Sequence, residues 1–328
     1  PLRNAQFIPS KPPLFHWLAA AASEATGQVN EVTMRFPSAL LGAAGVSLVY
    51  LAGAHFWSPL VGFFATLVLA TSFEWWLTAT IARVDMTLNF ILLCFFLFFY
   101  TTYRSGGGRG KAVGLGVIIG LAVLAKGPLG GIIPFLTILL FLFCQRNMSF
   151  IRKLHPVAMF FTAALVAGSW YLLAYWEGGE SFLRRLFHEN IDAALGEGGG
   201  HRQSFFYFVP VLFSHMAPWS LFLPAVAAFL YRSRKQLAQQ GLLYPLVWFA
   251  VVFMFFSVAA GKRPVYILPL YPAVALVFGV WYRNLVAQDR LARNPLTRLG
   301  GYLAGAAFLL FSGLVFAQLA GIDLVQLA

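Results

Sequence analysis

Residues 82–100, ARVDMTLNFILLCFFLFFY, decide the fold because they place a charged pair directly before a long apolar run. The apolar run at 86–103 is close to the roughly 20 residues that a helix needs to cross about 30 Å of hydrocarbon. The rest of the chain repeats this pattern, since 60% of its 328 residues are hydrophobic and 10% are charged. Soluble domains are about 45–50% apolar and about 25% charged. The sequence therefore predicts an all-α fold, a polytopic bundle of transmembrane helices.

The apolar runs predict ten membrane helices within one domain, residues 1–328. Two other stretches, 12–25 and the aromatic stretch 204–217, are expected to form short helices along the membrane surface. The chain shows no internal repeat, which disfavours a transporter built from two repeated halves. The ten predicted membrane helices are 36–56, 60–80, 86–103, 112–125, 128–144, 155–176, 219–231, 242–260, 264–283 and 299–319.

The net charge of +12 comes from basic residues that gather in short loops between the apolar runs. Such loops are typical of the cytoplasmic side of a membrane protein, so we expect membrane lipids rather than nucleic acid as partners. Alternating the helices across the membrane places the four basic loops on one side without conflict, and this side is predicted to face the cytoplasm. The four loops are 104–111, 145–155, 232–240 and 283–298.

The opposite, outer side carries more basic residues than the positive-inside bias leads us to expect. It contains the loops 1–35, 81–85, 177–218 and 261–264 and a tight turn near 126. Either these side chains anchor the protein at the membrane interface, or several of them form a site for an anion. The basic residues on this side are Arg3, Lys11, Arg35, Arg83, Lys126, Arg184, Arg185, Arg202, Lys262 and Arg263.

Asp85 has two interpretations at this outer side. At the start of a helix its carboxylate would accept a backbone N–H as a cap. Alternatively it belongs to a polar site. Residues i and i+2 of a helix do not face each other, so Arg83 and Asp85 are expected to have partners elsewhere. A carboxylate near a guanidinium stays ionised, which suits a group that accepts a proton or holds a hydroxyl.

Three further outer positions present ammonium or guanidinium groups. Lys11 precedes two prolines that keep it out of a helix, so it is either a solvated loop residue or a cation presented beside an apolar surface. Lys126 lies in a tight turn between two helices, and Lys262 and Arg263 lie in another. The prolines that follow Arg263 predict a bent helix. Cations without a convincing metal pattern suit an anionic leaving group such as a phosphate.

His188 and Glu189 are the outer-loop candidates for a metal site. One His beside one Glu is weak evidence, because a metal needs at least two further ligands. We therefore expect that no cofactor is required, and the involvement of a divalent cation stays open. Cys94 and Cys144 lie inside apolar runs, which indicates packing residues.

Six motifs in fixed order resemble those of the bacterial polyprenyl-phosphate-sugar glycosyltransferases. This family includes the lipid A aminoarabinose transferase and relatives of the protein O-mannosyltransferases. The resemblance covers about residues 1–275 and implies the GT-C fold, a bundle of membrane helices with short periplasmic surface helices. The motifs are KPPLFHW (11–17), RFPSALLG (35–42), ARVDMTL (82–88), AKGPLGGIIP (125–134), HRQSFFYF with APWSLFLP (201–208 and 217–224) and GKRPVYILPLYPA (261–273).

The resemblance also implies roles for single residues. Lys11 matches a lysine that contacts the carrier phosphate, and Arg83 with Asp85 matches a second acidic motif that lines the site. Lys126 and the pair Lys262–Arg263 match basic positions that face the same cavity.

The remaining matches concern a metal and the principal carboxylate. His188 falls in a loop where relatives have a histidine. The aminoarabinose transferase has a glutamate before the KPP lysine that is linked with a metal, and here that position is Ser10. The family's principal catalytic carboxylate lies upstream of KPPL, so we expect this chain to be truncated at its N-terminus, and at its C-terminus as well.

The expected function is that of an inverting glycosyltransferase at the periplasmic face of the bacterial inner membrane. It would move a sugar from a polyprenyl phosphate such as undecaprenyl phosphate to a lipid or envelope acceptor such as lipid A. A transporter or flippase for a lipid-linked anion is the alternative, but the helices between 86 and 176 are almost wholly apolar at mid-depth, which disfavours it. A structural membrane subunit is the third interpretation.

Overall fold

The computed structural model describes residues 2–3, 6–7, 11–195, 203–288, 295 and 297–302. Its strands β1 (Leu2–Arg3) and β2 (Gln6–Phe7) pair antiparallel. Its helices are α1 (Leu14–Thr26), α2 (Glu31–Phe56), α3 (Pro59–Ala70), α4 (Phe73–Ala79), α5 (Val84–Arg104), α6 (Arg109–Lys126), α7 (Leu129–Cys144), α8 (Phe150–Lys153), α9 (Pro156–Leu195), η1 (Phe205–Tyr207), α10 (Phe208–His215), η2 (Trp219–Phe222), α11 (Leu223–Arg232), α12 (Leu243–Val258), η3 (Pro264–Leu270) and α13 (Tyr271–Ala287).

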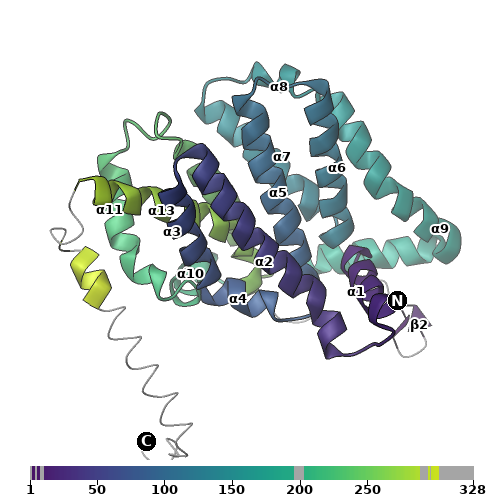
Figure 1. Cartoon of the computed structure of the whole chain (residues 1–328). Coiled ribbons are helices and arrows are strands. Elements are labelled where there is room, and N and C mark those ends of the chain that lie inside the picture. Colours follow the sequence, from purple (N-terminus) through teal and green to yellow (C-terminus); the bar gives the residue numbers. More distant parts are fainter. Residues whose placement is uncertain are drawn as a thin grey trace, which may run out of the picture.

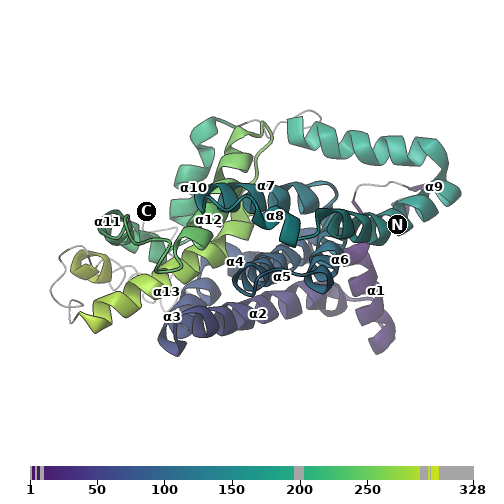
Figure 2. The same cartoon turned by 90° about the horizontal axis from the view of Figure 1, so that it is seen from above.

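The helices form a bundle in which α5 lies between α2, α6 and α7 (Figures 1 and 2). An aromatic cluster fixes α5 against α12. The rings of Tyr100 and Tyr244 stack with their centroids 4.6 Å apart, and the hydroxyl of Tyr244 donates to the backbone oxygen of Phe96 at 2.7 Å. Trp248 covers the ring of Phe96 at 4.3 Å. The centre of the bundle is therefore held by aromatic packing, and the backbone satisfies the hydroxyl of Tyr244.

Small residues let neighbouring helices approach closely. A Cβ added to Gly53 in α2 would lie 2.6 Å from the Cα of Gly62 in α3. A Cβ on Gly130 in α7 would lie 2.3 Å from the backbone carbon of Ala122 in α6. Close contact through small residues is typical of helix association in membranes, because packing replaces the hydrophobic driving force there.

Helices occupy the predicted ranges from 36–56 to 264–283, while 299–319 lies largely outside the described residues. The predicted helix at 60–80 is broken into α3 and α4, which meet at a 68° bend. The helix at 219–231 consists of η2 and α11, and it meets the segment formed by η1 and α10 at 106°. The prolines after Arg263 produce the 3₁₀ segment η3, which continues into α13. The all-α fold is confirmed, with the short β1–β2 pair as an addition.

Four of the described helices are long and apolar enough to cross a membrane, and six segments are if each bent pair counts as one. α7 and α12 have 16 residues each, which corresponds to about 24 Å of helix. The chain is a membrane protein, and the number of ten membrane crossings stays a prediction.

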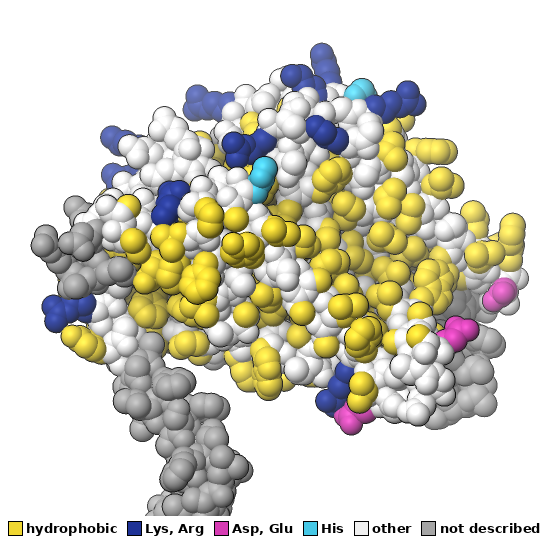
Figure 3. Space-filling view, in the orientation of Figure 1, with side chains coloured by type: hydrophobic (Ala, Val, Ile, Leu, Met, Phe, Trp, Pro, Cys, Tyr) yellow, Lys and Arg dark blue, Asp and Glu magenta, His cyan; other side chains and the backbone are white. Residues whose placement is uncertain are grey.

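The two ends of the bundle differ in charge. Lys and Arg side chains gather at the end that carries α8, while acidic side chains lie at the opposite end (Figure 3). We call these the α8 end and the α4 end. After Gly179, which has φ 68°, α9 changes direction and runs across the α4 end (Figures 1 and 2). This second part of α9 falls within the predicted outer loop 177–218.

Candidate functional site at the α4 end

Asp85 lies in the first turn of α5, and its side chain is buried. The helix begins at Val84, and Arg83 is the N-cap with an extended backbone at φ −142° and ψ 150°. Of the two interpretations of Asp85, the helix cap is therefore wrong. A carboxylate in the first turn is still favoured by the helix dipole, and here it turns toward α6.

Lys126, the last residue of α6, is the partner of Asp85. Its Nζ lies 2.5 Å from Oδ1 of the carboxylate, and its side chain is only 11% exposed. Gly127 follows with φ 80°, a conformation that favours glycine and allows α7 to begin at Leu129. The Lys126 ammonium also lies 4.7 Å from the centre of the Tyr266 ring in η3. Three elements, α5, α6 and η3, thus meet at this ammonium, and an aromatic face is a favourable surface for it.

Arg83 lies on the other side of the carboxylate. Its Nε is 4.0 Å from Oδ2 of Asp85, and its side chain is 45% exposed. The prediction that the two residues are not partners is therefore wrong in part, because Arg83 precedes the helix and its side chain turns toward Asp85. The contact is long, and the Arg83 side chain is partly exposed. Lys126 remains the close partner.

Lys262 is buried between α12 and η3. Its ammonium donates to the backbone oxygen of Ala259 at 2.5 Å and to that of Gln203 at 3.1 Å. Burial lowers the pKa of Lys262. Arg263 is the N-cap of η3 and its side chain is exposed. Of these two adjacent basic residues, Lys262 is held by backbone oxygens, whereas Arg263 is an exposed cation.

The other predicted site residues are placed as follows. Lys11 is half-buried directly before α1, which packs against α2, α5 and α6. His188 and Glu189 are on the second part of α9, where the side chains lie outside the described ones. Among the described residues, no group of three or more His, Cys, Asp or Glu is placed to hold a metal ion.

The sequence analysis missed a second buried carboxylate. Glu74 in α4 is buried and contacts Nδ1 of His215 at the end of α10. Glu74 and Asp85 are the two buried acids among the side chains that the structure describes. Glu74 is the one charged residue of the predicted helix at 60–80, and an ionisable residue within a membrane segment is a reason to expect a function.

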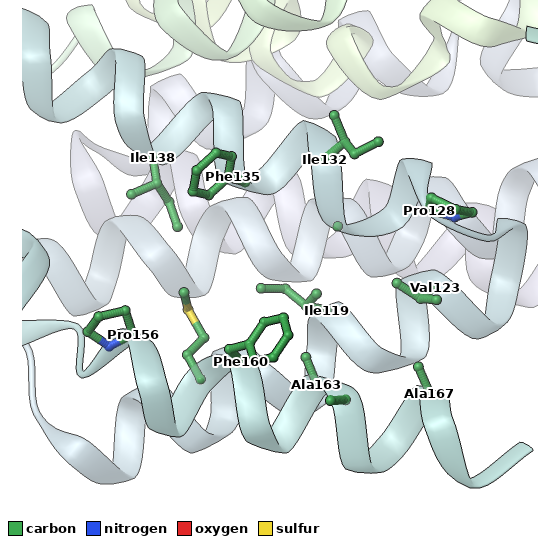
Figure 4. A pocket seen from close by; sticks show the side chains of 13 residues that line it. Ile119, Val123, Pro128, Ile132, Phe135, Ile138, Pro156, Phe160, Ala163 and Ala167 are labelled. Atoms are coloured by element: carbon green, nitrogen blue, oxygen red, sulfur yellow. The ribbon is translucent and has the colours of Figure 1, made fainter. Parts of the chain in front are cut away.

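Two apolar grooves reach the α4 end on either side of α7. The first, of about 610 Å³, lies between α6, α7 and α9 and runs from Pro128 to Pro156 (Figure 4). Pro128 is two residues from Lys126. The second, of about 880 Å³, lies between α7 and α12 and reaches Ala259, whose backbone oxygen accepts from Lys262. Apolar side chains line both grooves, which therefore suit hydrocarbon chains.

Comparisons with known proteins show what the whole chain is similar to. Residues 10–172 match the family described as dolichyl-phosphate-mannose-protein mannosyltransferase. The chain is 28% identical over 305 residues to the undecaprenyl phosphate-α-4-amino-4-deoxy-L-arabinose arabinosyl transferase of Edwardsiella ictaluri. That match covers 90% of this chain and 54% of the relative, so the chain spans about half the length of the curated relatives it matches.

Solved structures show the same fold. The apo crystal structure of ArnT from Cupriavidus metallidurans has a TM-score of 0.78 and 25% identity, covering 97% of this chain and 56% of ArnT. The structure of that protein bound to undecaprenyl phosphate has a TM-score of 0.77 and 23% identity, covering 96% of this chain and 63% of ArnT. These matches confirm the resemblance that the six motifs indicated.

Proposed function

We propose that this chain, which is related in sequence and in fold to the GT-C glycosyltransferases of the lipid A aminoarabinose transferase type, acts as an inverting glycosyltransferase. Its donor is a sugar on a polyprenyl phosphate, and its acceptor is a lipid or envelope glycan such as lipid A. The observation that carries the proposal is the buried Asp85–Lys126 pair with Tyr266 against the ammonium.

The ammonium of Lys126 is the proposed contact for the carrier phosphate. An ammonium has three N–H donors, and in this structure one is directed to Asp85 while the Tyr266 ring covers another side. A phosphate oxygen would take a remaining donor. As the bond between the anomeric carbon and the phosphate oxygen breaks, negative charge grows on the phosphate, and a fixed cation stabilises that charge. The guanidinium of Arg83 is a second group for the same phosphate.

Asp85 is proposed to orient the site rather than to act as the base. Its carboxylate is held at 2.5 Å by Lys126, so it stabilises the ammonium, and its second oxygen, which lies 4.0 Å from Nε of Arg83, is the one to accept from a sugar hydroxyl. Negative charge near the anomeric carbon also favours an oxocarbenium-like transition state. The acceptor oxygen attacks the anomeric carbon, and its proton goes to a carboxylate for which we assign no described residue.

The polyprenyl tail is proposed to lie in the groove between α6, α7 and α9. This groove begins at Pro128, beside Lys126, and its lining is apolar along its length (Figure 4). A phosphate at Lys126 would then hold the head of the lipid while the tail follows the bundle toward the α8 end. The exposed Arg263 at the start of η3 and Lys11 before α1 are further candidate cations for the same head group, whereas Lys262 is held by backbone oxygens next to η3.

The α4 end is proposed to face the periplasm from the bacterial inner membrane. The cations of the loops after α5, α7 and α11 lie at the α8 end, which supports a cytoplasmic position for that end (Figure 3). The candidate site then opens on the side where a lipid-linked sugar donor and lipid A would meet.

A transfer assay in liposomes tests the proposal. We expect the full-length protein to transfer a labelled sugar from a polyprenyl phosphate donor to lipid A, and Lys126→Met in that protein to abolish transfer. Lys111→Met is the matched control, because it removes an ammonium at the α8 end that contacts Ser105. Movement of the labelled donor across vesicles that lack any acceptor, without transfer when acceptor is present, would instead support a transporter.

A further inference from the structure

Two bent helices are joined to each other at their breaks. The first bend separates α3 from α4, and the second separates α10 from η2. The indole Nε1 of Trp219 donates to Oγ1 of Thr71 at 2.7 Å, so the start of η2 is fixed to the end of α3. Glu74 and His215 form the second contact, and the Phe73 ring meets the imidazole edge-on at 5.7 Å. Both contacts lie within a few residues of a bend.

The Glu74 carboxylate is an unusual group to bury at such a joint. It accepts a weak hydrogen bond from Thr78 at 3.5 Å and interacts electrostatically with the phenols of Tyr207 and Tyr271. The hydroxyl of Tyr271 is buried without a hydrogen-bond partner among the described residues. Apolar side chains would stabilise a helix joint at least as well as a buried polar contact of this kind does. A contribution to the geometry of the site therefore explains this pair better than stability alone.

The segment that this pair encloses is η3. Both α4 and α10 pack against η3, and so does α5. Prolines at 264 and 269 remove backbone donors from η3, and 3₁₀ hydrogen bonds have poorer geometry than those of an α-helix. The position of η3 thus depends on its neighbours more than on its own backbone. η3 carries Tyr266, whose ring lies against the ammonium of Lys126.

We infer that Glu74 and His215 are positioning residues that hold α4 and α10 together around η3, and so place Tyr266 against Lys126. The inference rests on the proposed function for its effect on sugar transfer, while the effect on η3 is independent of it. Removing the polar contact would let η3 shift. The donor phosphate would then bind more weakly, while the bundle would stay folded.

Two substitutions of the same residue separate the polar contact from packing. Glu74→Leu keeps an apolar side chain in the buried site but removes the acceptor, whereas Glu74→Gln keeps an oxygen that accepts from the imidazole N–H. We expect Glu74→Leu to raise the KM for the polyprenyl phosphate donor about tenfold or more, and Glu74→Gln to stay within about threefold of wild type. Glu180→Gln is the control, because it removes an exposed carboxylate that pairs with Arg184.

Hydrogen exchange measures the position of η3 without any assay of activity. In Glu74→Leu and in His215→Leu, exchange should rise in residues 264–270 and stay unchanged in α2 and α5. Unchanged exchange in 264–270 would overturn the inference, and so would a rise throughout the bundle, since that would indicate general loss of stability.

A double-mutant cycle with Tyr266→Ala tests the connection to the site. If Glu74 acts through Tyr266, Glu74→Leu should have little further effect on donor KM in the Tyr266→Ala protein. Additive effects would contradict the inference. An inactive full-length protein would refute the proposed function, and the exchange experiment would still decide the role of Glu74.

Discussion

Replacing Lys126 by methionine separates the stability of the buried pair from its chemistry. Methionine keeps a long apolar side chain next to Tyr266 but leaves the Asp85 carboxylate buried without its close partner. Removing one member of a buried ion pair destabilises a protein by about 3–5 kcal/mol, and both side chains here are mostly buried. Arg83 at 4.0 Å offers a partial replacement, so we expect a loss near the lower limit, about 3 kcal/mol.

The double variant Asp85→Asn with Lys126→Met is the informative comparison. It removes both charges, so no unpaired ion stays buried, and its free energy of unfolding should return to within about 1 kcal/mol of wild type. Sugar transfer should stay absent, because the cation for the phosphate is missing.

Unfolding by a titration with denaturing detergent in micelles measures these differences, and the transfer assay is run on the same preparations. The Lys111→Met protein should unfold like wild type. A double variant as unstable as Lys126→Met alone would refute the reasoning, as would recovery of transfer in the double variant.

Substitutions at three other positions give separate tests. Tyr266→Phe should bind a polyprenyl phosphate like wild type, because the ring stays against the ammonium of Lys126. Tyr266→Leu should lose about 0.5–2 kcal/mol of binding free energy, measured by lipid titration in nanodiscs. Equal binding by both variants would exclude a contribution of the ring. Gly130→Leu should lower the unfolding temperature, because its Cβ would lie 2.3 Å from the backbone of Ala122 in α6. An unchanged temperature would show that α6 and α7 can move apart without loss of stability. Gly131→Phe should leave the unfolding temperature unchanged, since its Cβ would meet only side chains at 3.8 Å or more. It should nevertheless fill the groove of Figure 4 and reduce transfer from long-chain donors more than from short-chain donors. An equal effect on both donors would place the lipid tail elsewhere.

The sequence was sufficient to locate the helices because membrane segments must be long and apolar, and this requirement is visible in each segment alone. It also placed Asp85 and Lys126 on one side of the membrane through the positions of the basic loops. Their direct contact could not be predicted, because 41 residues separate them and the contact depends on how α5 packs against α6. The cap at Arg83 was missed because a difference of two residues in the helix start changes which side chain lies outside the helix.

Long-range contacts explain the remaining differences. Glu74 and His215 are 141 residues apart, and they meet because two apolar segments bend rather than run straight. The break at Ser72 had a signal, since serine is a common residue before a helix start, but a continuous apolar run is equally typical of one straight helix. Composition and spacing do not decide between these alternatives, whereas the packing of α4 and α10 on η3 does.

The most direct test of the proposed site is the affinity of the protein for undecaprenyl phosphate in nanodiscs. The wild-type protein and Lys111→Met should bind this lipid equally, and Lys126→Met should bind it at least about tenfold more weakly, because a charge-assisted contact to the phosphate is lost. Equal binding by all three proteins would contradict the assignment of the carrier phosphate to the Asp85–Lys126–Tyr266 site.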